Sequence, residues 1–151
     1  MKLSVGADMD APLVHETLKQ LKKHGHEVIY YGPKSKSSVP WPEVARQVAE
    51  DVASGRCKEG ILFGWTGTGV SIVANKINGI RAALCGDAET AKSARVTNNA
   101  NVLCLSIRAT SEALAGEILT AWFSNHYQST PNNDACQAEI RELEQSNNLK
   151  K

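Results

Sequence analysis

The sequence predicts a single doubly wound α/β domain, with a five-stranded parallel sheet and an extra C-terminal helix. Short apolar runs alternate with amphipathic segments along the chain, which is typical of strands that alternate with helices. The apolar runs are nearly continuous, as expected for strands with both faces covered. The length of 151 residues suits one domain with its own hydrophobic core.

The first half of the chain supplies three strands and two helices. Apolar runs predict strands over residues 3–7, 27–31 and 60–63, and helical patterns cover 13–23 and 42–53. Lys22 and Lys23 lie in the last turn of the first helix, and Gly25 ends it. Pro42 is tolerated at the start of the second helix, where the backbone N–H has no intrahelical partner.

The second half continues the alternation and adds one element. We expect strands over 80–85 and 101–105 and helices over 70–76, 87–95 and 111–123. Ser111 is a candidate N-cap for the last of these helices. After a polar stretch over 128–134, a sparse apolar stripe predicts a final helix over about 134–147. Because this helix lies beyond a finished domain, we expect it to pack on a neighbouring subunit.

The charge balance excludes several classes of protein. With 17 Lys+Arg against 16 Asp+Glu, the formal net charge is +1, so there is no basic field for nucleic acid or for a membrane surface. No apolar run approaches the roughly 20 residues of a membrane span. The first strand starts within the first few residues, so we expect no signal peptide and a cytoplasmic location.

The four cysteines are widely spaced, with no CxxC pair. Cys85 and Cys104 lie inside apolar runs, where a thiol usually acts as a small buried hydrophobe. We therefore expect four free thiols, with an extracellular frame of two disulfides as the alternative. No two histidines have metal-ligand spacing with a carboxylate, so no metal site is expected.

Ligands of open parallel sheets bind beyond the carboxyl ends of the strands, and we place three loops there. They are the loops over residues 8–10, 64–69 and 97–99, with Arg108 just past the last strand. Asp8 could accept a hydrogen bond from a substrate hydroxyl. The alternative is that Asp8 or Asp10 caps the helix that starts near Pro12.

The second loop, Gly64-Trp65-Thr66-Gly67-Thr68-Gly69, is the most informative. Its glycines let backbone N–H groups turn towards a phosphate or an oxyanion such as an enediolate. It is neither a Walker motif nor GxGxxG, and a tight turn without any ligand is the alternative. Trp65 is either a wall of the substrate site or a surface plug.

Several motifs occur together with this loop: Thr66-Gly67-Thr68-Gly69-Val70-Ser71-Ile72, Ala74-Asn75-Lys76, Gly79-Ile80-Arg81-Ala82-Ala83 and Asn98-Asn99-Ala100-Asn101. The start of the chain adds Val5-Gly6-Ala7-Asp8 and Gly25-His26-Glu27-Val28. Over about residues 2–127, this combination resembles the type B ribose-5-phosphate isomerase and galactose-6-phosphate isomerase family.

The resemblance implies a Rossmann-like sheet and a homodimer or tetramer, or a heteromer with a related chain, with active sites at the subunit interface. It also implies aldose–ketose isomerisation of a sugar phosphate without metal or organic cofactor. In that reaction a proton moves between C1 and C2 through an enediolate. Carried over, residues 66–69 would hold the oxyanion, Asp8 and Asn98 would contact the substrate beside Met9 and Trp65, and Arg108 would belong to the phosphate end.

The chain departs from the family pattern at the catalytic positions. The usual cysteine base falls at Gly64, and the glutamate that replaces it in some members falls at Val70. The family usually has a histidine at the position of Met9, and a second histidine, which opens the sugar ring, at the position of Thr97. The tail over 131–136 lacks the arginines and histidine that relatives often use for phosphate.

We expect an isomerase of a pentose or hexose phosphate with a relocated base: Asp8, Asp10 or a residue of a partner chain. The alternatives are a catalytically inactive or half-site subunit and a sugar-phosphate-binding module, because glycine cannot abstract a proton. Arg108, Arg81 and Arg141 all stay open as phosphate ligands.

Overall fold

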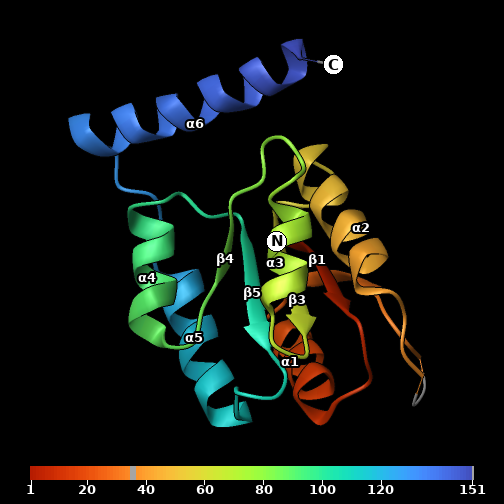
Figure 1. Cartoon of the computed structure of the whole chain (residues 1–151). Helices are drawn as coiled ribbons and strands as arrows, with labels where there is room; N and C mark the ends of the chain where they lie inside the picture. The colour runs from red at the N-terminus through yellow and green to blue at the C-terminus, as the bar shows by residue number, and fades with distance from the viewer. Residues whose placement is uncertain (35–36, 151) are drawn as a thin grey trace.

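The computed structural model describes residues 1–34 and 37–150. Five strands form one parallel sheet in the order β2-β1-β3-β5-β4 (Figure 1). The strands are β1 (Lys2–Ala7), β2 (Glu27–Tyr31), β3 (Glu59–Gly64), β4 (Ala82–Leu84) and β5 (Val102–Ser106). The helices are α1 (Pro12–Lys23), α2 (Trp41–Ala53), α3 (Thr68–Ala74), α4 (Ala88–Val96), α5 (Glu112–Ser124) and α6 (Pro131–Leu149). The predicted doubly wound α/β fold is confirmed.

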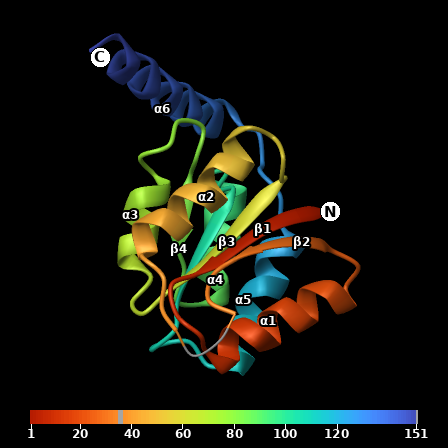
Figure 2. The ribbon, with the colours of Figure 1, turned by 90° about the vertical axis from the view of Figure 1, so that its right-hand side faces the viewer.

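Helices cover both faces of the sheet (Figure 2). One face packs against α1, α4 and α5, and its core includes Phe63, Ile118 and Trp122. The other face packs against α2 and α3, with Val48 and Leu62 at its centre. Because both faces are covered, the central strands are mostly apolar, with Ser4 and Glu59 as buried exceptions, and they show no regular alternation of polar and apolar residues.

The amino-terminal edge of the sheet is fixed by a buried ion pair. Arg95 of α4 donates to Glu59 of β3 at 2.6 Å, and Trp122 of α5 donates from Nε1 to the other oxygen of Glu59 at 2.8 Å. The guanidinium also lies over the Trp122 ring, 4.9 Å from its centroid. These contacts satisfy a carboxylate that would otherwise be costly to bury.

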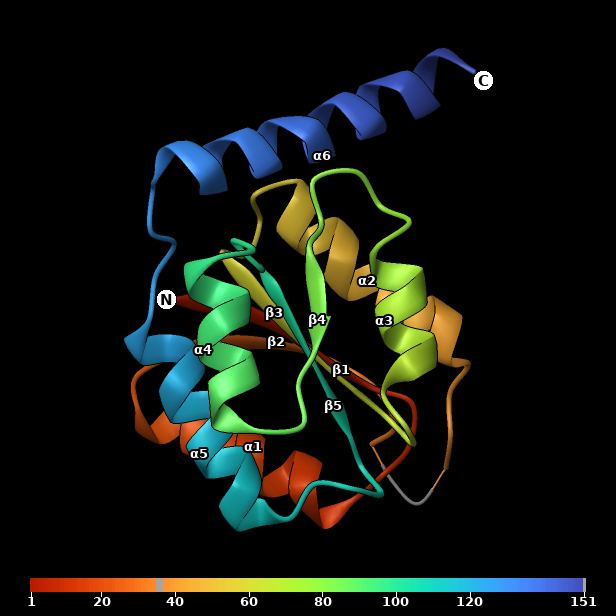
Figure 3. The ribbon, with the colours of Figure 1, turned by 60° about the vertical axis from the view of Figure 1, so that its left-hand side comes forward.

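The last helix lies apart from the two helical layers, across the amino-terminal side of the sheet (Figure 3). It is longer than predicted, because Thr130 caps it by accepting from the Asn133 N–H at 3.1 Å and Pro131 occupies its first turn. Gln137 is its one buried residue among those the structure describes, and Leu143 is 64% exposed. The helix therefore leaves most of its surface uncovered within one chain.

The remaining expectations about local structure are partly confirmed. Ser111 caps α5 as predicted, accepting from the Leu114 N–H at 3.1 Å. All four cysteines are free, and only Cys136 is exposed. Within the described part of the chain, no helix combines the length and the apolar character needed to cross a membrane.

Candidate active site at the carboxyl ends of β1 and β3

The connections of β1 and β3 leave the sheet on opposite faces. The chain passes from β1 into α1 on one face and from β3 into α3 on the other. Where neighbouring strands diverge in this way, their loops separate and open a crevice at the carboxyl edge, which is the usual ligand site of doubly wound sheets. A cavity of about 270 Å³ lies at this point.

The cavity is lined by residues from three segments: Asp8 after β1, Trp41 at the start of α2, and Gly64, Trp65, Thr66, Gly67, Thr68, Gly69 and Val70 around the β3–α3 turn. The structure therefore brings together Asp8 and the complete glycine loop, as the sequence predicts. Trp41 was missed by the sequence analysis. No local sequence pattern marks it, because Trp41 reaches this edge through the packing of α2 beside α3.

The glycine loop has a conformation that its residue types require. Gly67 has a φ of 79°, and a Cβ at this position would lie 2.5 Å from Cδ1 of Leu84 and 3.1 Å from the carbonyl of Leu105. Thr66 and Thr68 hydrogen-bond through their hydroxyls at 2.8 Å. The Thr68 N–H also donates to the Thr66 hydroxyl at 3.4 Å, and Gly67 provides no side chain to cap α3, so the following N–H groups of the first turn lack a side-chain cap.

Asp8 is positioned by backbone hydrogen bonds on both sides. Its N–H donates to the Phe63 carbonyl at 3.3 Å, and its carbonyl accepts from the Val39 N–H at 2.9 Å. Oδ1 of the side chain is buried and has no hydrogen-bond partner among the described residues. Burial raises the pKa of this carboxyl, although the N–H groups of Asp8 and Trp65 oppose the shift.

The alternative role for the first-loop carboxylates, capping α1, is wrong. The N-cap of α1 is Ala11, which makes no side-chain cap hydrogen bond. Asp10 pairs instead with His15 one turn into the helix. Asp8 therefore does not cap α1.

Two tryptophans border the cavity. Trp41 is 45% exposed and Trp65 is 53% exposed, so both rings keep accessible surface beside the loop. The Trp41 ring packs directly on the backbone of Gly69, because a Cβ there would lie 3.0 Å from Cε3 of Trp41. Such rings can stack on the C–H faces of a sugar, and the position of Trp65 in the cavity lining is compatible with a role as a wall of the substrate site.

The loop at 97–99 lies at the amino ends of the strands, on the side of the sheet opposite the cavity. The prediction that it lies at the carboxyl ends of the strands is wrong. A segment that precedes a parallel strand lies at the amino end of that strand, so Thr97 and Asn98 are near α6 rather than near the cavity. The carbonyl of Asn98 accepts from Nε2 of Gln137 at 3.0 Å, and that of Asn99 accepts from Nε of Arg81 at 2.6 Å. One chain therefore does not unite these residues with Asp8 and the glycine loop.

Met9 and Arg108 lie at the correct edge but outside the cavity lining. Met9 pairs with Ser38 in an isolated antiparallel bridge. The N–H of Arg108 donates to the Trp65 carbonyl at 3.0 Å, while its side chain is exposed. The end of β5 thus fixes the glycine loop through the backbone, and the guanidinium of Arg108 is free to approach a ligand at this edge.

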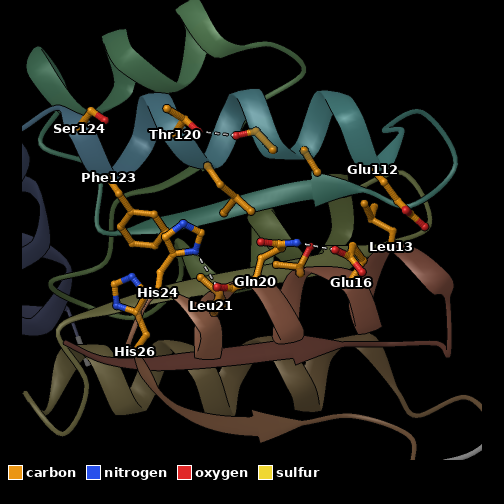
Figure 4. A pocket seen from close by; sticks show the side chains of 14 residues that line it. Leu13, Glu16, Gln20, Leu21, His24, His26, Glu112, Thr120, Phe123 and Ser124 are labelled. Carbon is orange, nitrogen blue, oxygen red and sulfur yellow. Dashed lines mark hydrogen bonds between the residues drawn. The ribbon is translucent and has the colours of Figure 1, made fainter.

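A second, larger cavity of about 480 Å³ lies between α1 and α5 (Figure 4). Several of its polar groups are engaged with one another or with the backbone: Gln20 donates to Glu16 at 2.6 Å, and Nδ1 of His24 lies 2.8 Å from the Gln20 carbonyl. The His26 ring stacks on Phe123 with centroids 4.9 Å apart. Burial lowers the pKa of His26, which favours its neutral form. In the described residues this cavity has neither the glycine loop nor a buried carboxylate oxygen without a partner, so it is the weaker candidate.

Comparisons with known proteins identify the family of the chain. Residues 3–139 match the model of the Ribose/Galactose Isomerase family. The chain belongs to this family. It is 37% identical over 148 residues to ribose-5-phosphate isomerase B of Escherichia coli, with 97% of this chain and 99% of the relative covered.

A second relative and a solved structure extend the match. The chain is 38% identical over 130 residues to D-erythrulose-4-phosphate isomerase of Pectobacterium atrosepticum, covering 85% of this chain and 86% of that one. The structure of Clostridium thermocellum ribose-5-phosphate isomerase B superposes with a TM-score of 0.92 at 38% identity, covering 97% and 99% of the two chains. The fold and the family are therefore those that the sequence motifs indicate.

Proposed function

We propose that this protein interconverts the aldose and ketose forms of a sugar phosphate through an enediolate. The observation that carries the proposal is the cavity that joins Asp8 to the glycine loop in a member of an isomerase family. The relatives are named for ribose 5-phosphate and D-erythrulose 4-phosphate, which are small substrates. A volume of about 270 Å³ suits a molecule of this size better than a larger ligand.

The glycine loop provides the oxyanion site of this reaction. When the carbonyl oxygen of the substrate becomes an enediolate oxygen, negative charge develops on it. The backbone N–H groups of residues 66–69 and the hydroxyls of Thr66 and Thr68 are the donors that stabilise this charge. The reaction moves protons within one molecule and has no net oxidant or reductant, so we propose that it needs no cofactor.

We further propose that the complete site is formed by two copies of the chain. Thr97 and Asn98 lie at the amino edge, whereas the cavity is at the carboxyl edge, so a second copy is the direct way to bring them together. The uncovered α6 next to Asn98 gives such a copy a surface to pack on. A heteromer with a related chain is the second arrangement, and we place either assembly in the cytoplasm.

The test is product formation by the purified protein. D-ribose 5-phosphate, D-erythrulose 4-phosphate and D-galactose 6-phosphate are each incubated with the protein, and the aldose and ketose are quantified by NMR. The proposal predicts conversion of at least one of them and slower conversion of unphosphorylated D-ribose. Binding of these compounds without conversion would favour the half-site or binding-module alternative, which the isomerase relatives do not favour.

A further inference from the structure

Asp8 and Gly64 are neighbours across two adjacent strands. The register of β1 and β3 pairs Gly6 with Leu62 and Ala7 with Phe63, so its next step sets Asp8 beside Gly64. Adjacent strands lie about 4.8 Å apart. The two positions are therefore side by side at the end of the sheet, at the start of the diverging loops.

Both positions project to the face covered by α2 and α3. A Cβ on Gly6 would meet Cγ1 of Val44, and a Cβ on Gly60 would meet Cγ1 of Val48, both from α2. Side chains alternate between faces along a strand, so Asp8, two residues after Gly6, projects to this face. Gly64, four residues after Gly60, does so too. A carboxylate thus stands next to a position that has no side chain.

Among the described residues that line this cavity, Asp8 is the one with an ionisable side chain. Its neighbour Asp10 is not part of the lining and is paired with His15. The buried thiols do not line it either, and burial raises the pKa of Cys85 to about 11. In the part of the chain that the structure describes, Asp8 is therefore the one cavity side chain that can take and return a proton.

We propose that Asp8 is the general base of this protein and carries the proton between C1 and C2 in place of a residue at position 64. This proposal rests on the proposed function, because it assumes a sugar phosphate in this cavity. The unpartnered Oδ1 is the atom assigned to the transfer. Among the described residues it has no hydrogen-bond partner, so Oδ1 has a lone pair available to accept a proton.

With an aldose as substrate, the proton moves from C2 to C1 in three steps. Asp8 removes the proton from C2, and the C–H electrons form the C1–C2 double bond while the carbonyl electrons move to O1. The proton of the C2 hydroxyl then passes to O1, and the protonated Asp8 returns its proton to C1. C2 becomes the carbonyl carbon, and Asp8 is a carboxylate again. The raised pKa of Asp8 makes it a stronger base than an exposed aspartate.

The first test compares Asp8→Asn with the matched control Asp10→Asn, using whichever of the three sugar phosphates the wild-type protein converts. Loss of a general base lowers kcat by about 10²–10⁴-fold. We expect Asp8→Asn to lower kcat in this range with a change in KM of about threefold or less, and Asp10→Asn to keep both values near wild type. We also expect the acid limb of the kcat profile in pH to disappear in Asp8→Asn.

The second test is chemical rescue, which a merely structural role would not show. Formate added to Asp8→Gly supplies a carboxylate of the correct chemistry, and we expect kcat to rise with its concentration. Full kcat in Asp8→Asn, or an effect on KM alone, would overturn the assignment of Asp8 while leaving the isomerase function intact. Absence of conversion by the wild-type protein would instead overturn the proposed function, and this assignment with it.

Discussion

Val70 packs against the face of Gly64 where a side chain would begin. A Cβ built on Gly64 would lie 3.3 Å from Cγ2 and 3.4 Å from Cγ1 of Val70, and 3.4 Å from the Gly67 nitrogen. These are close contacts that a small shift of the Val70 methyl groups relieves. The backbone of Gly64 is ordinary strand, so nothing in its conformation requires glycine. Position 64 can therefore accept a side chain.

This relationship predicts that Gly64→Cys folds and places a thiol in the cavity. We expect its free energy of unfolding to stay within about 1 kcal/mol of wild type, and the thiol to react with iodoacetamide more slowly in the presence of substrate. The matched control is Gly6→Ala, where the Cβ would meet Cγ1 of Val44 at 2.5 Å inside the core. Overpacking there costs about 1–3 kcal/mol. Equal losses of stability for both variants, measured in urea, would contradict this account of the site.

Asp8→Asn is predicted to stabilise the fold at neutral pH. Burial raises the folded-state pKa of Asp8 above its ordinary 3.8. As the pH rises from about 3.8 through the folded-state pKa, the unfolded state loses this proton more readily than the native state, so the free energy of unfolding falls. The variant escapes this loss. Its advantage in thermal midpoint is expected at pH 7 and should vanish below about pH 3.5, where the carboxyl is protonated in both states.

Asp87→Asn is the control with the opposite sign. The Thr90 N–H donates to Asp87 at 2.7 Å and lowers the pKa of that carboxyl, which caps α4. This stabilisation is present above the ordinary pKa and is lost as the pH falls through the folded-state value. Asp87→Asn should therefore be less stable than wild type at pH 7, and the two should converge in acid. If Asp8→Asn and Asp87→Asn changed the stability in the same direction at pH 7, a destabilising burial of the Asp8 carboxylate would be contradicted.

Trp41 is predicted to bind substrate with little effect on stability. Its ring lies on Gly69 and is 45% exposed, so removing it uncovers one wall of the cavity and leaves the core intact. We expect Trp41→Ala to raise KM by about tenfold, which corresponds to roughly 1.4 kcal/mol of an aromatic contact. Trp41→Phe retains a ring and should stay within about threefold. A lowered kcat with unchanged KM would place Trp41 in the chemistry instead.

Complementation tests the two-copy site. If Asp8 and Asn98 meet from different chains, a mixed dimer of Asp8→Asn and Asn98→Ala has one site with both wild-type residues and one with neither. Random mixing would then restore about a quarter of wild-type activity, because half of the dimers are mixed and each has one complete site. Both variants are inactive or weak alone. No gain above the sum of the separate activities, after refolding the two together, would contradict a shared site.

The parts of the site predictable from sequence are those fixed within one strand and its loop. Asp8 ends a buried strand and the glycine loop ends another, so their common place at the carboxyl edge follows from the parallel order alone. Trp41 reaches the cavity through the packing of α2 on α3, a contact between distant segments that no local pattern records.

The structure differs from the sequence prediction at three places, and each difference has a physical cause. The loop at 97–99 precedes β5, and a segment before a parallel strand lies at the amino ends of the strands, so the general rule for ligand loops does not apply to it. Asp8 and Asp10 fit the residue preference of an N-cap, but Ala11 has that position and Asp10 pairs with His15. The C-terminal helix begins at Pro131 because Thr130 caps it.

Deuterium incorporation tests the central claim most directly, since it reports the removal of a carbon-bound proton by this chain. The wild-type protein is incubated in D₂O with D-ribose 5-phosphate, D-erythrulose 4-phosphate and D-galactose 6-phosphate, with Asp8→Asn in parallel. We predict that the proton held by Asp8 exchanges with D₂O before it is returned, which places deuterium at C1 of the ketose and C2 of the aldose for at least one compound, and that Asp8→Asn lowers this incorporation by about 10²-fold or more. Carbon positions that stay fully protonated with the wild-type protein, while the compounds bind, would contradict it.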